Sequence, residues 1–279
     1  MISTVVGGYM FLSFLFVIGL ALGSFLNVVV LRLNTGENLR GRSRCFSCLR
    51  KLEWRDLVPV ASYLAIRGRC RTCGSGISAQ YPIVELVAAA LTTGAAYMMF
   101  GVSVPQDPVR ILQYILVVKF LLILLAASVY DLRHKIIPDQ LSFLLFITAA
   151  VLEAVVAWQQ RPFYVDEGFL LYDIVAGIGA FAFFAGIWLI SKGAWMGFGD
   201  AKIALPIGLF LGFPNIMYAL LAAFWSGAII GIALLASKRM SRKSEIPFAP
   251  FLALGTYIVF FLMNFGATEW LTNMFIQGM

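Results

Sequence analysis

The chain has 279 residues, of which 61% are hydrophobic and only 13% are charged. A soluble domain is typically about 45–50% apolar and about 25% charged, so this composition excludes an ordinary soluble domain and indicates an integral membrane protein. The net charge of +7 comes entirely from residues 32–80, which hold ten Lys or Arg and three acidic residues. Such a basic segment can bind nucleic acid. Beside a transmembrane helix, however, it usually marks the cytoplasmic side, so we expect no nucleic-acid partner.

Eight apolar segments follow one another along the chain. They are 8–31, 82–100, 111–130, 137–158, 169–191, 201–212, 215–237 and 248–266. About 20 predominantly apolar residues are needed to cross a bilayer. The first segment has no basic start and no small-residue cleavage site, so we expect a retained helix rather than a signal peptide. The sequence therefore predicts an all-α polytopic membrane protein with about eight transmembrane helices.

The four cysteines of the chain lie in the basic segment after the first helix. Cys45, Cys48, Cys70 and Cys73 form the pattern C-x2-C-x21-C-x2-C, in which two x2 knuckles can present four thiolates to one tetrahedral zinc ion. Disulfides are the alternative, but they are uncommon in the cytosol. We therefore expect a small cytoplasmic zinc-binding insertion at 32–81, between a first helix at 1–31 and a membrane-embedded domain at 82–279. The zinc is expected to be structural, because four thiolates leave no open coordination position.

A long uncharged run near the end of the chain must contain two crossings. Residues 203–237 carry no charge and are too many for one span, while basic residues on both sides place both ends inside the cell. The Gly and Pro of the GFPN sequence at 212–215 predict a turn there. The first arm, 201–212, is then short.

Two aspartates are expected at the cytoplasmic ends of membrane helices. Asp131 ends the third apolar segment, and Asp200 follows Gly197 and Gly199 in the sequence WMGFGDAKIA. Charged groups in a membrane are costly and indicate function. The glycines are expected to remove side-chain bulk, so that a substrate backbone can approach, and to interrupt the helix. If the two carboxylates meet, they share a proton, and one acts as a base on water while the other acts as an acid on a carbonyl.

Four other charged residues have structural interpretations. Lys119 and Glu153 lie at similar depth on consecutive spans and predict a buried ion pair, unless Glu153 reaches out to the interface. Asp139 follows Pro138 and is expected to cap a helix. Lys202 is interpreted as an anchor at the inner face, with contact to an acidic group of a substrate as the alternative.

Taken together, these motifs resemble those of bacterial type IV prepilin peptidases, which are intramembrane aspartyl proteases of the Gly-x-Gly-Asp class and also N-methyltransferases. The matching stretches are GSFLNVVVLRL at 23–33, the two cysteine knuckles, DLVPVASYLAIRGRCRTCGSGISAQYPIVEL at 56–86, DLRHKIIPDQLS at 131–142, MGFGDAKIA at 196–204 and PFAPFLALG at 247–255. Two departures are Phe46, where a proline is usual, and Ala249, where a glycine is usual.

The resemblance implies that Asp131 and Asp200 are the catalytic pair. It implies cleavage of the basic leader of a prepilin or pseudopilin after Gly, at the cytoplasmic face of the bacterial inner membrane. The new N-terminal residue is then expected to be methylated with S-adenosylmethionine, and the cysteine domain to serve this reaction or its folding. No residues that bind this cofactor emerge from the sequence.

A non-enzymatic alternative stays open at this point. The chain can be interpreted as a membrane-anchored zinc-ribbon protein that binds or assembles partners through its basic domain. The two aspartates at the inner face separate the two interpretations, because a scaffold has no need for them.

Overall fold

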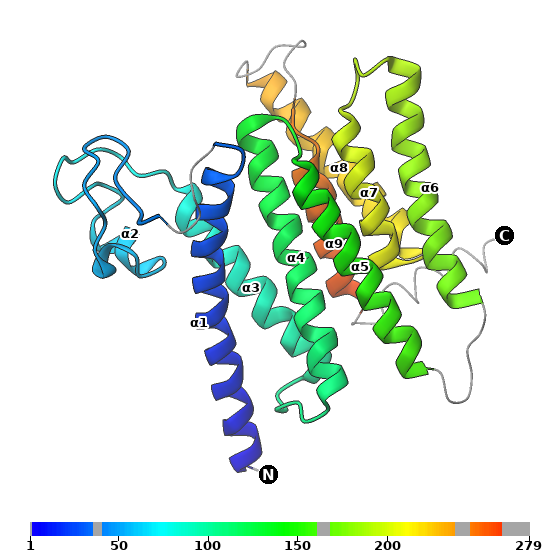
Figure 1. Cartoon of the computed structure of the whole chain (residues 1–279), viewed down its shortest axis with the longest axis horizontal. Helices are drawn as coiled ribbons and strands as arrows, with labels where there is room; N and C mark the ends of the chain where they lie inside the picture. Colours follow the sequence, from blue (N-terminus) through cyan, green and yellow to red (C-terminus); the bar gives the residue numbers. More distant parts are fainter. Residues whose placement is uncertain (1, 36–40, 161–167, 238–245, 264–279) are drawn as a thin grey trace. The chain divides into compact units, whose positions relative to one another are not determined.

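The computed structural model describes residues 2–35, 41–160, 168–237 and 246–263, and these parts are helical, without strands (Figure 1). The chain forms two compact units, Met1–Pro105 and Gln106–Met279. This division falls later than the domain boundary that the sequence predicted at residue 82. The reason is that the second long helix packs against the first.

The first unit consists of two long helices and the cysteine segment between them. Helices α1 (Ile2–Arg32) and α3 (Gln80–Phe100) pack along each other. A side chain at Gly23 of α1 would lie 2.6 Å from the Cα atom of Glu85 on α3, so the glycine permits the close approach. The intervening segment contains only a 3-10 turn, η1 (Trp54–Asp56), and a short helix, α2 (Ala61–Ala65), among its described residues.

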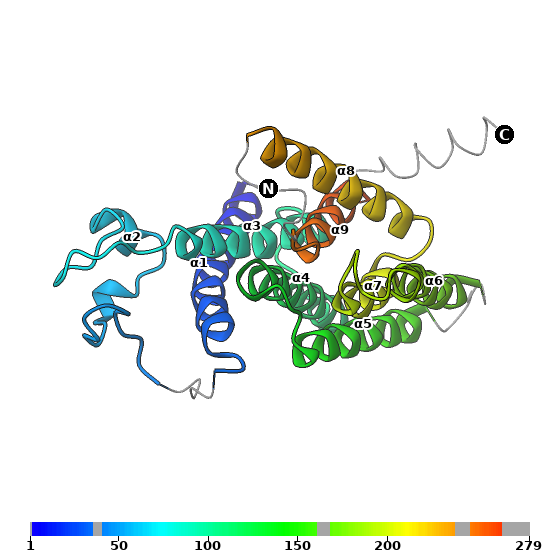
Figure 2. The same ribbon diagram turned by 90° about the horizontal axis from the view of Figure 1, so that it is seen from above.

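The second unit contains six helices in the part of it that the structure describes. They are α4 (Pro108–His134), α5 (Asp139–Gln160), α6 (Gly168–Ser191), α7 (Phe198–Leu211), α8 (Asn215–Ala236) and α9 (Ala249–Met263). Seen from above, α7 lies among α5, α6 and α9 (Figure 2). Its close packing on α6 depends on glycine, because a side chain at Gly208 would lie 2.6 Å from the Cα atom of Gly177.

Local sequence explains where the helices that matter for function begin and end. The Asp107 carboxylate accepts a hydrogen bond from the Val109 N–H at 2.9 Å, and Pro108 fills the first position of α4, where no N–H is needed. The same helix ends where Lys135 adopts the left-handed conformation. As predicted, the GFPN sequence separates two helices: α7 ends at Leu211 and α8 begins at Asn215.

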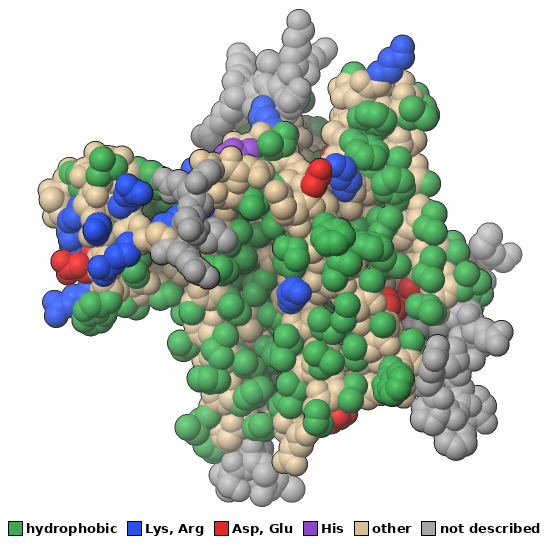
Figure 3. Space-filling model, in the orientation of Figure 1, with side chains coloured by type: hydrophobic (Ala, Val, Ile, Leu, Met, Phe, Trp, Pro, Cys, Tyr) green, Lys and Arg blue, Asp and Glu red, His purple; other side chains and the backbone are tan. Residues whose placement is uncertain are grey.

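The helices confirm the predicted all-α membrane fold. Six of them, α1, α3, α4, α5, α6 and α8, are long and apolar enough to cross a bilayer, while α7 and the described part of α9 are shorter. On the face drawn in Figure 3, hydrophobic side chains cover most of the helical surface, and Lys and Arg gather on the segment between α1 and α3. The chain is therefore a multi-pass membrane protein.

Candidate active site and cysteine cluster

Asp131 lies in the last turn of α4 and is buried, with 5% of its surface exposed. Its Oδ2 atom accepts a hydrogen bond of 3.3 Å from the backbone N–H of Ala249, the first residue of α9. One turn earlier, the Ser128 hydroxyl donates to the carbonyl oxygen of Leu124 at 2.8 Å and also lies 3.4 Å from the carbonyl oxygen of Ala249. The carboxylate is thus held in place by the start of another helix, a contact that the sequence did not reveal.

Asp200 lies in the first turn of α7 and is equally buried, with 6% of its surface exposed. Gly197 precedes the helix in extended conformation, with φ −72° and ψ 148°, and its carbonyl accepts from the Asp200 N–H at 3.3 Å. The positive end of a helix dipole stabilises a carboxylate in the first turn. The helix dipole of α7 therefore offsets part of the cost of burying the Asp200 carboxylate.

Both aspartates are buried in the second unit. Helices α5 and α9 each pack against both α4 and α7, the two helices that carry the pair. An aromatic column further along the same helices joins α4, α7 and α9: the ring of Phe120 on α4 stacks on Phe210 of α7 at 4.2 Å, and Phe210 stacks on Phe260 of α9 at 5.7 Å. Two carboxyl groups that repel each other in a buried site share a proton more readily than they both ionise.

The two glycines before Asp200 differ in their surroundings. Gly197 has open space where a side chain would lie, with only a backbone atom 3.9 Å away. Gly199 is part of α7, and a side chain there would meet Ile137 at 3.0 Å. The prediction that the glycines interrupt the helix is therefore wrong for Gly199, which lets Ile137 pack against the first turn.

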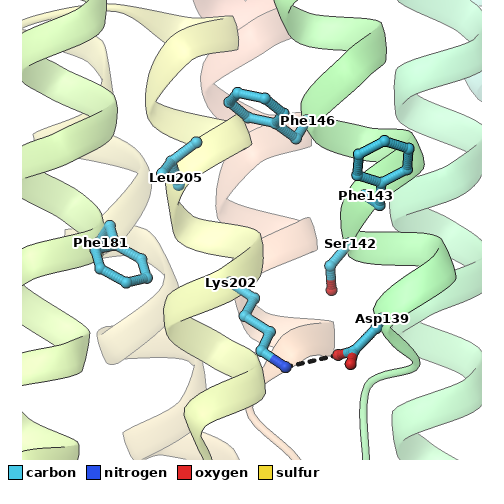
Figure 4. A pocket seen from close by; sticks show the side chains of 7 residues that line it. All are labelled: Asp139, Ser142, Phe143, Phe146, Phe181, Lys202 and Leu205. Carbon is cyan, nitrogen blue, oxygen red and sulfur yellow. Dashed lines mark hydrogen bonds and ion pairs between the residues drawn. The ribbon is translucent and has the colours of Figure 1, made fainter.

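A salt bridge joins the starts of α5 and α7 in the second unit. Lys202 Nζ, two residues after Asp200, donates to Asp139 Oδ1 at 2.6 Å, and Asp139 is the first residue of α5 (Figure 4). The pair borders a hollow of about 370 Å³, whose other lining residues are Ser142, Phe143, Phe146, Phe181 and Leu205. Lys202 thus has a partner within the chain, and Asp139 ties α5 to α7 besides starting its helix.

The four cysteines form one cluster in the first unit. Their sulfur atoms all lie within 4.8 Å of one another, a grouping that is able to hold a metal ion. The Sγ atoms of Cys45 and Cys73 are 3.8 Å apart, which equals the edge of about 3.8 Å that a tetrahedron has when its metal–sulfur distance is about 2.3 Å, the value for zinc. The donor set and its geometry therefore fit a zinc ion.

Both knuckles have the same backbone hydrogen bonds. The N–H of Cys45 donates to the Arg50 carbonyl, and the N–H of Leu49 donates to the Cys45 carbonyl. In the second knuckle, Cys70 donates to Ser75, and Gly74 donates to Cys70. Leu49 and Gly74 are thus equivalent positions, and both have positive φ, 57° and 69° respectively.

The thiol groups of the cluster differ in acidity. Hydrogen bonds from the backbone of Cys48 and Ser47 lower the pKa of Cys45 to about 6. At Cys48, a backbone hydrogen bond from Arg50 favours the thiolate, but burial and the other three thiols outweigh it and raise the pKa to about 11. Hydrogen bonds from Ser75 lower the pKa of Cys73 as well. The thiols of Cys45 and Cys73 therefore ionise more readily than that of Cys48, and a bound cation is needed to hold all four as thiolates.

A buried carboxylate joins the two knuckles. Asp56, whose side chain is 6% exposed, accepts from Arg50 at 2.5 Å and from Arg71 Nε at 2.8 Å. Burial alone would raise the pKa of Asp56, but the Glu53 backbone N–H and the two guanidinium groups outweigh it and hold the pKa below its usual range. Sequence inspection missed this residue, because its partners belong to different knuckles.

The predicted ion pair between Lys119 and Glu153 is wrong. Lys119 is exposed and forms no ion pair with any described residue. Glu153 instead lies close enough to the buried Asp173 of α6 to interact with it electrostatically. The depth estimate placed Lys119 and Glu153 at one level but carried no information on which way each helix faces.

Comparisons with known proteins match nearly the whole chain. The model of the bacterial peptidase A24 N-terminal domain matches residues 17–100, and the model of the type IV leader peptidase family matches residues 118–232. The first range contains the cysteine cluster, and the second contains both aspartates. No solved structure is significantly similar.

Several curated relatives share one name, prepilin leader peptidase/N-methyltransferase. The relative from Myxococcus xanthus is 35% identical over 85% of this chain and 68% of its own length. The one from Bacillus subtilis is 31% identical over 89% of this chain and 93% of its own, and the one from Aeromonas hydrophila is 30% identical over 95% of both. The similarity therefore extends over both compact units.

Proposed function

The chain belongs to the type IV leader peptidase family, and we propose that it is the enzyme that removes the leader of prepilins or pseudopilins and methylates the new N-terminus. The observation that carries the proposal is the burial of two carboxylates, Asp131 and Asp200, at the ends of two helices that share α5 and α9 as neighbours. The names of the relatives supply the substrate class.

In the proposed reaction the two aspartates act without a covalent intermediate. One carboxylate takes a proton from a water molecule, whose oxygen attacks the scissile carbonyl carbon, and the protonated partner donates to the carbonyl oxygen. Collapse of the tetrahedral intermediate breaks the C–N bond and returns a proton to the leaving amine. The Ala249 N–H fixes the orientation of Asp131 during these transfers.

We place the reaction at the cytoplasmic face of the bacterial inner membrane. Asp131 stands at the end of α4 and Asp200 at the start of α7, beside the short basic segment that holds Arg133, His134 and Lys135. Basic connections favour the cytoplasmic side. Gly197 leaves open space before Asp200, so it remains the glycine whose lack of a side chain can admit substrate backbone.

The cysteine cluster is proposed to hold a structural zinc ion through Cys45, Cys48, Cys70 and Cys73. Four protein thiolates satisfy a tetrahedral ion fully, so the zinc organises a segment with few other contacts. The name of the relatives includes N-methyltransferase, and we propose S-adenosylmethionine as the methyl donor. Among the described residues we find no site that matches this cofactor, and we derive no step of methyl transfer.

The comparisons do not favour the alternative of a non-enzymatic zinc-ribbon scaffold. A scaffold requires no pair of buried carboxylates, and the peptidase family model covers the region that contains the pair.

The proposed function is tested with the purified full-length protein in detergent and a synthetic pilin leader peptide that spans the Gly–Phe junction. Mass spectrometry should show cleavage after Gly and, with S-adenosylmethionine present, a gain of one methyl group on the new N-terminus. The Cys45→Ser variant is then assayed for leader cleavage with intact peptide and for methylation with pre-cleaved peptide, so that the two reactions are measured separately. Absence of cleavage by well-folded, zinc-loaded protein would contradict the proposal.

A further inference from the structure

The first cysteine knuckle carries basic side chains, several of which form no ion pair with a described residue. Residues 41–79 contain eight Lys or Arg and two acidic residues. Arg50 and Arg71 bind Asp56, and Arg50 also faces Glu53 at 3.8 Å. The remaining cations of this segment form no ion pair with a described residue.

Three of these free cations surround one hollow at the first knuckle. Arg42, Arg44 and Lys51 line a space of about 250 Å³ together with Leu49. Arg44 and Lys51 are held opposite each other by a backbone bridge. A hollow with three cations and no carboxylate attracts anions and repels cationic groups.

Large apolar side chains project from the same knuckle. Phe46 is 74% exposed and Leu49 is 65% exposed. The comparison with the second knuckle is informative, because the position equivalent to Leu49 is occupied by Gly74. Positive φ is costly for leucine and free for glycine, so the first knuckle retains an exposed apolar side chain at a position where its backbone favours glycine.

The bilayer surface lies within reach of this knuckle. The cysteine segment is tied at both ends to membrane helices, since it follows α1 at Arg32 and precedes α3 at Gln80. Arg42 is ten residues from the end of α1, a distance that an extended chain spans in at most about 35 Å. Cations around apolar side chains are the pattern by which peripheral segments bind anionic headgroups and insert into the acyl boundary.

We propose that the first knuckle docks on the bilayer: Arg42, Arg44 and Lys51 bind the phosphates of anionic phospholipids, and Phe46 and Leu49 insert between the headgroups. This contact orients the cysteine domain along the membrane surface, where the ends of substrates emerge. Nucleic acid could bind the cations but gives no role to the exposed apolar side chains. Binding of nucleic acid at this knuckle would therefore contradict the proposal.

The test uses Phe46→Trp in the full-length protein, reconstituted in nanodiscs. The discs contain phosphatidylcholine alone or with about 30% phosphatidylglycerol, each with and without bromine on the acyl chains. Bromine quenches a nearby indole, and subtraction of the wild-type signal isolates the indole introduced at position 46. Both leaflets are alike, so the result does not depend on the side that the knuckle occupies.

We expect bromine to quench at least about half of the position 46 emission in the phosphatidylglycerol discs and much less in phosphatidylcholine alone. In the Phe46→Trp background, the triple change R42Q/R44Q/K51Q should abolish the quenching, and Leu49→Gly should reduce it at least about twofold. Leu49→Gly copies the conformation of Gly74 and should fold. R67Q/R69Q removes two cations of the segment outside the hollow and serves as the charge control. Zinc content verifies folding of each variant.

Three results would overturn the proposal. They are no quenching in any disc, equal quenching with and without phosphatidylglycerol, and full quenching in the triple variant. A shift of the position 46 emission by a single-stranded DNA oligonucleotide in phosphatidylcholine discs would assign the cations to nucleic acid instead. Leader cleavage is measured separately in the same discs, so failure of docking and failure of the peptidase are distinguishable.

Discussion

The backbone N–H of Ala249 donates a hydrogen bond to the Asp131 carboxylate at 3.3 Å. The last turns of α4 therefore lie against the first residue of α9, whose carbonyl oxygen is 3.4 Å from the Ser128 hydroxyl. Ala249 acts through its backbone, so the contact does not depend on the alanine side chain.

Removal of the Ala249 N–H should impair cleavage. Ala249→Pro deletes the donor but suits the first turn of a helix, so α9 is expected to form while Asp131 loses its hydrogen bond. A hydrogen bond to a charged group contributes about 1.5–3 kcal/mol, which predicts a fall of about 10- to 100-fold in kcat. Ala249→Gly keeps the N–H and should retain most of the activity. Equal activity of the two variants, measured with the leader peptide, would show that the contact is unimportant.

Replacement of Lys119 with Met should leave stability nearly unchanged. Lys119 is exposed and has no ion-pair partner among the described residues, so its loss is expected to shift the free energy of unfolding by no more than about 0.5 kcal/mol. Asp173→Leu removes a buried partner of Glu153 and should be clearly more damaging. Thermal unfolding in detergent compares the two variants. A large loss of stability in Lys119→Met would support the ion pair between Lys119 and Glu153 after all.

Replacement of glycine by alanine should destabilise the protein at Gly208, where α6 and α7 are in contact, but not at Gly186 of α6. Gly208→Ala would place a Cβ atom 2.6 Å from Gly177 and requires a backbone shift, so we expect a loss of about 1–3 kcal/mol. Gly186, also helical, has nothing within 4 Å of that position. Gly186→Ala should therefore be neutral or stabilising by up to about 1 kcal/mol. The same unfolding assay tests both, and equal effects would contradict the packing.

The Asp56 bridge should make the cysteine segment sensitive to acid. Its folded-state pKa lies below the usual value of 3.8, so the carboxylate stabilises the fold fully above pH 3.8, and this contribution is lost as pH falls through the lower folded-state value. At pH 7, Asp56→Asn should increase the rate of limited proteolysis between the two knuckles. The difference from wild type should persist down to about pH 4 and shrink below it. A difference that is absent at pH 7 would contradict the bridge.

Periodicity and charge revealed the helices, the turn at 212–215, the cysteine cluster and both aspartates, because each depends on local composition or spacing. Contacts between distant residues were not predictable in the same way. Lys202 binds Asp139, which lies 63 residues away in the sequence. Asp131 contacts Ala249, which lies 118 residues away. The expected depth in the membrane paired Glu153 with Lys119. In the structure, the direction in which each helix faces places Glu153 near Asp173 instead. The association of α3 with α1 likewise depends on glycine packing that charge and hydropathy do not encode.

The most direct test of the proposed catalytic pair is single-turnover cleavage of the leader peptide by Asp131→Asn and Asp200→Asn. Asparagine preserves size but cannot exchange the proton, so each variant should cleave at least about 1,000-fold more slowly than wild type, as the loss of an acid–base residue predicts. Zinc content and thermal unfolding should stay at wild-type values, because the cysteine cluster lies outside the second unit. Near wild-type cleavage by either folded variant would contradict the assignment of Asp131 and Asp200 as the catalytic pair.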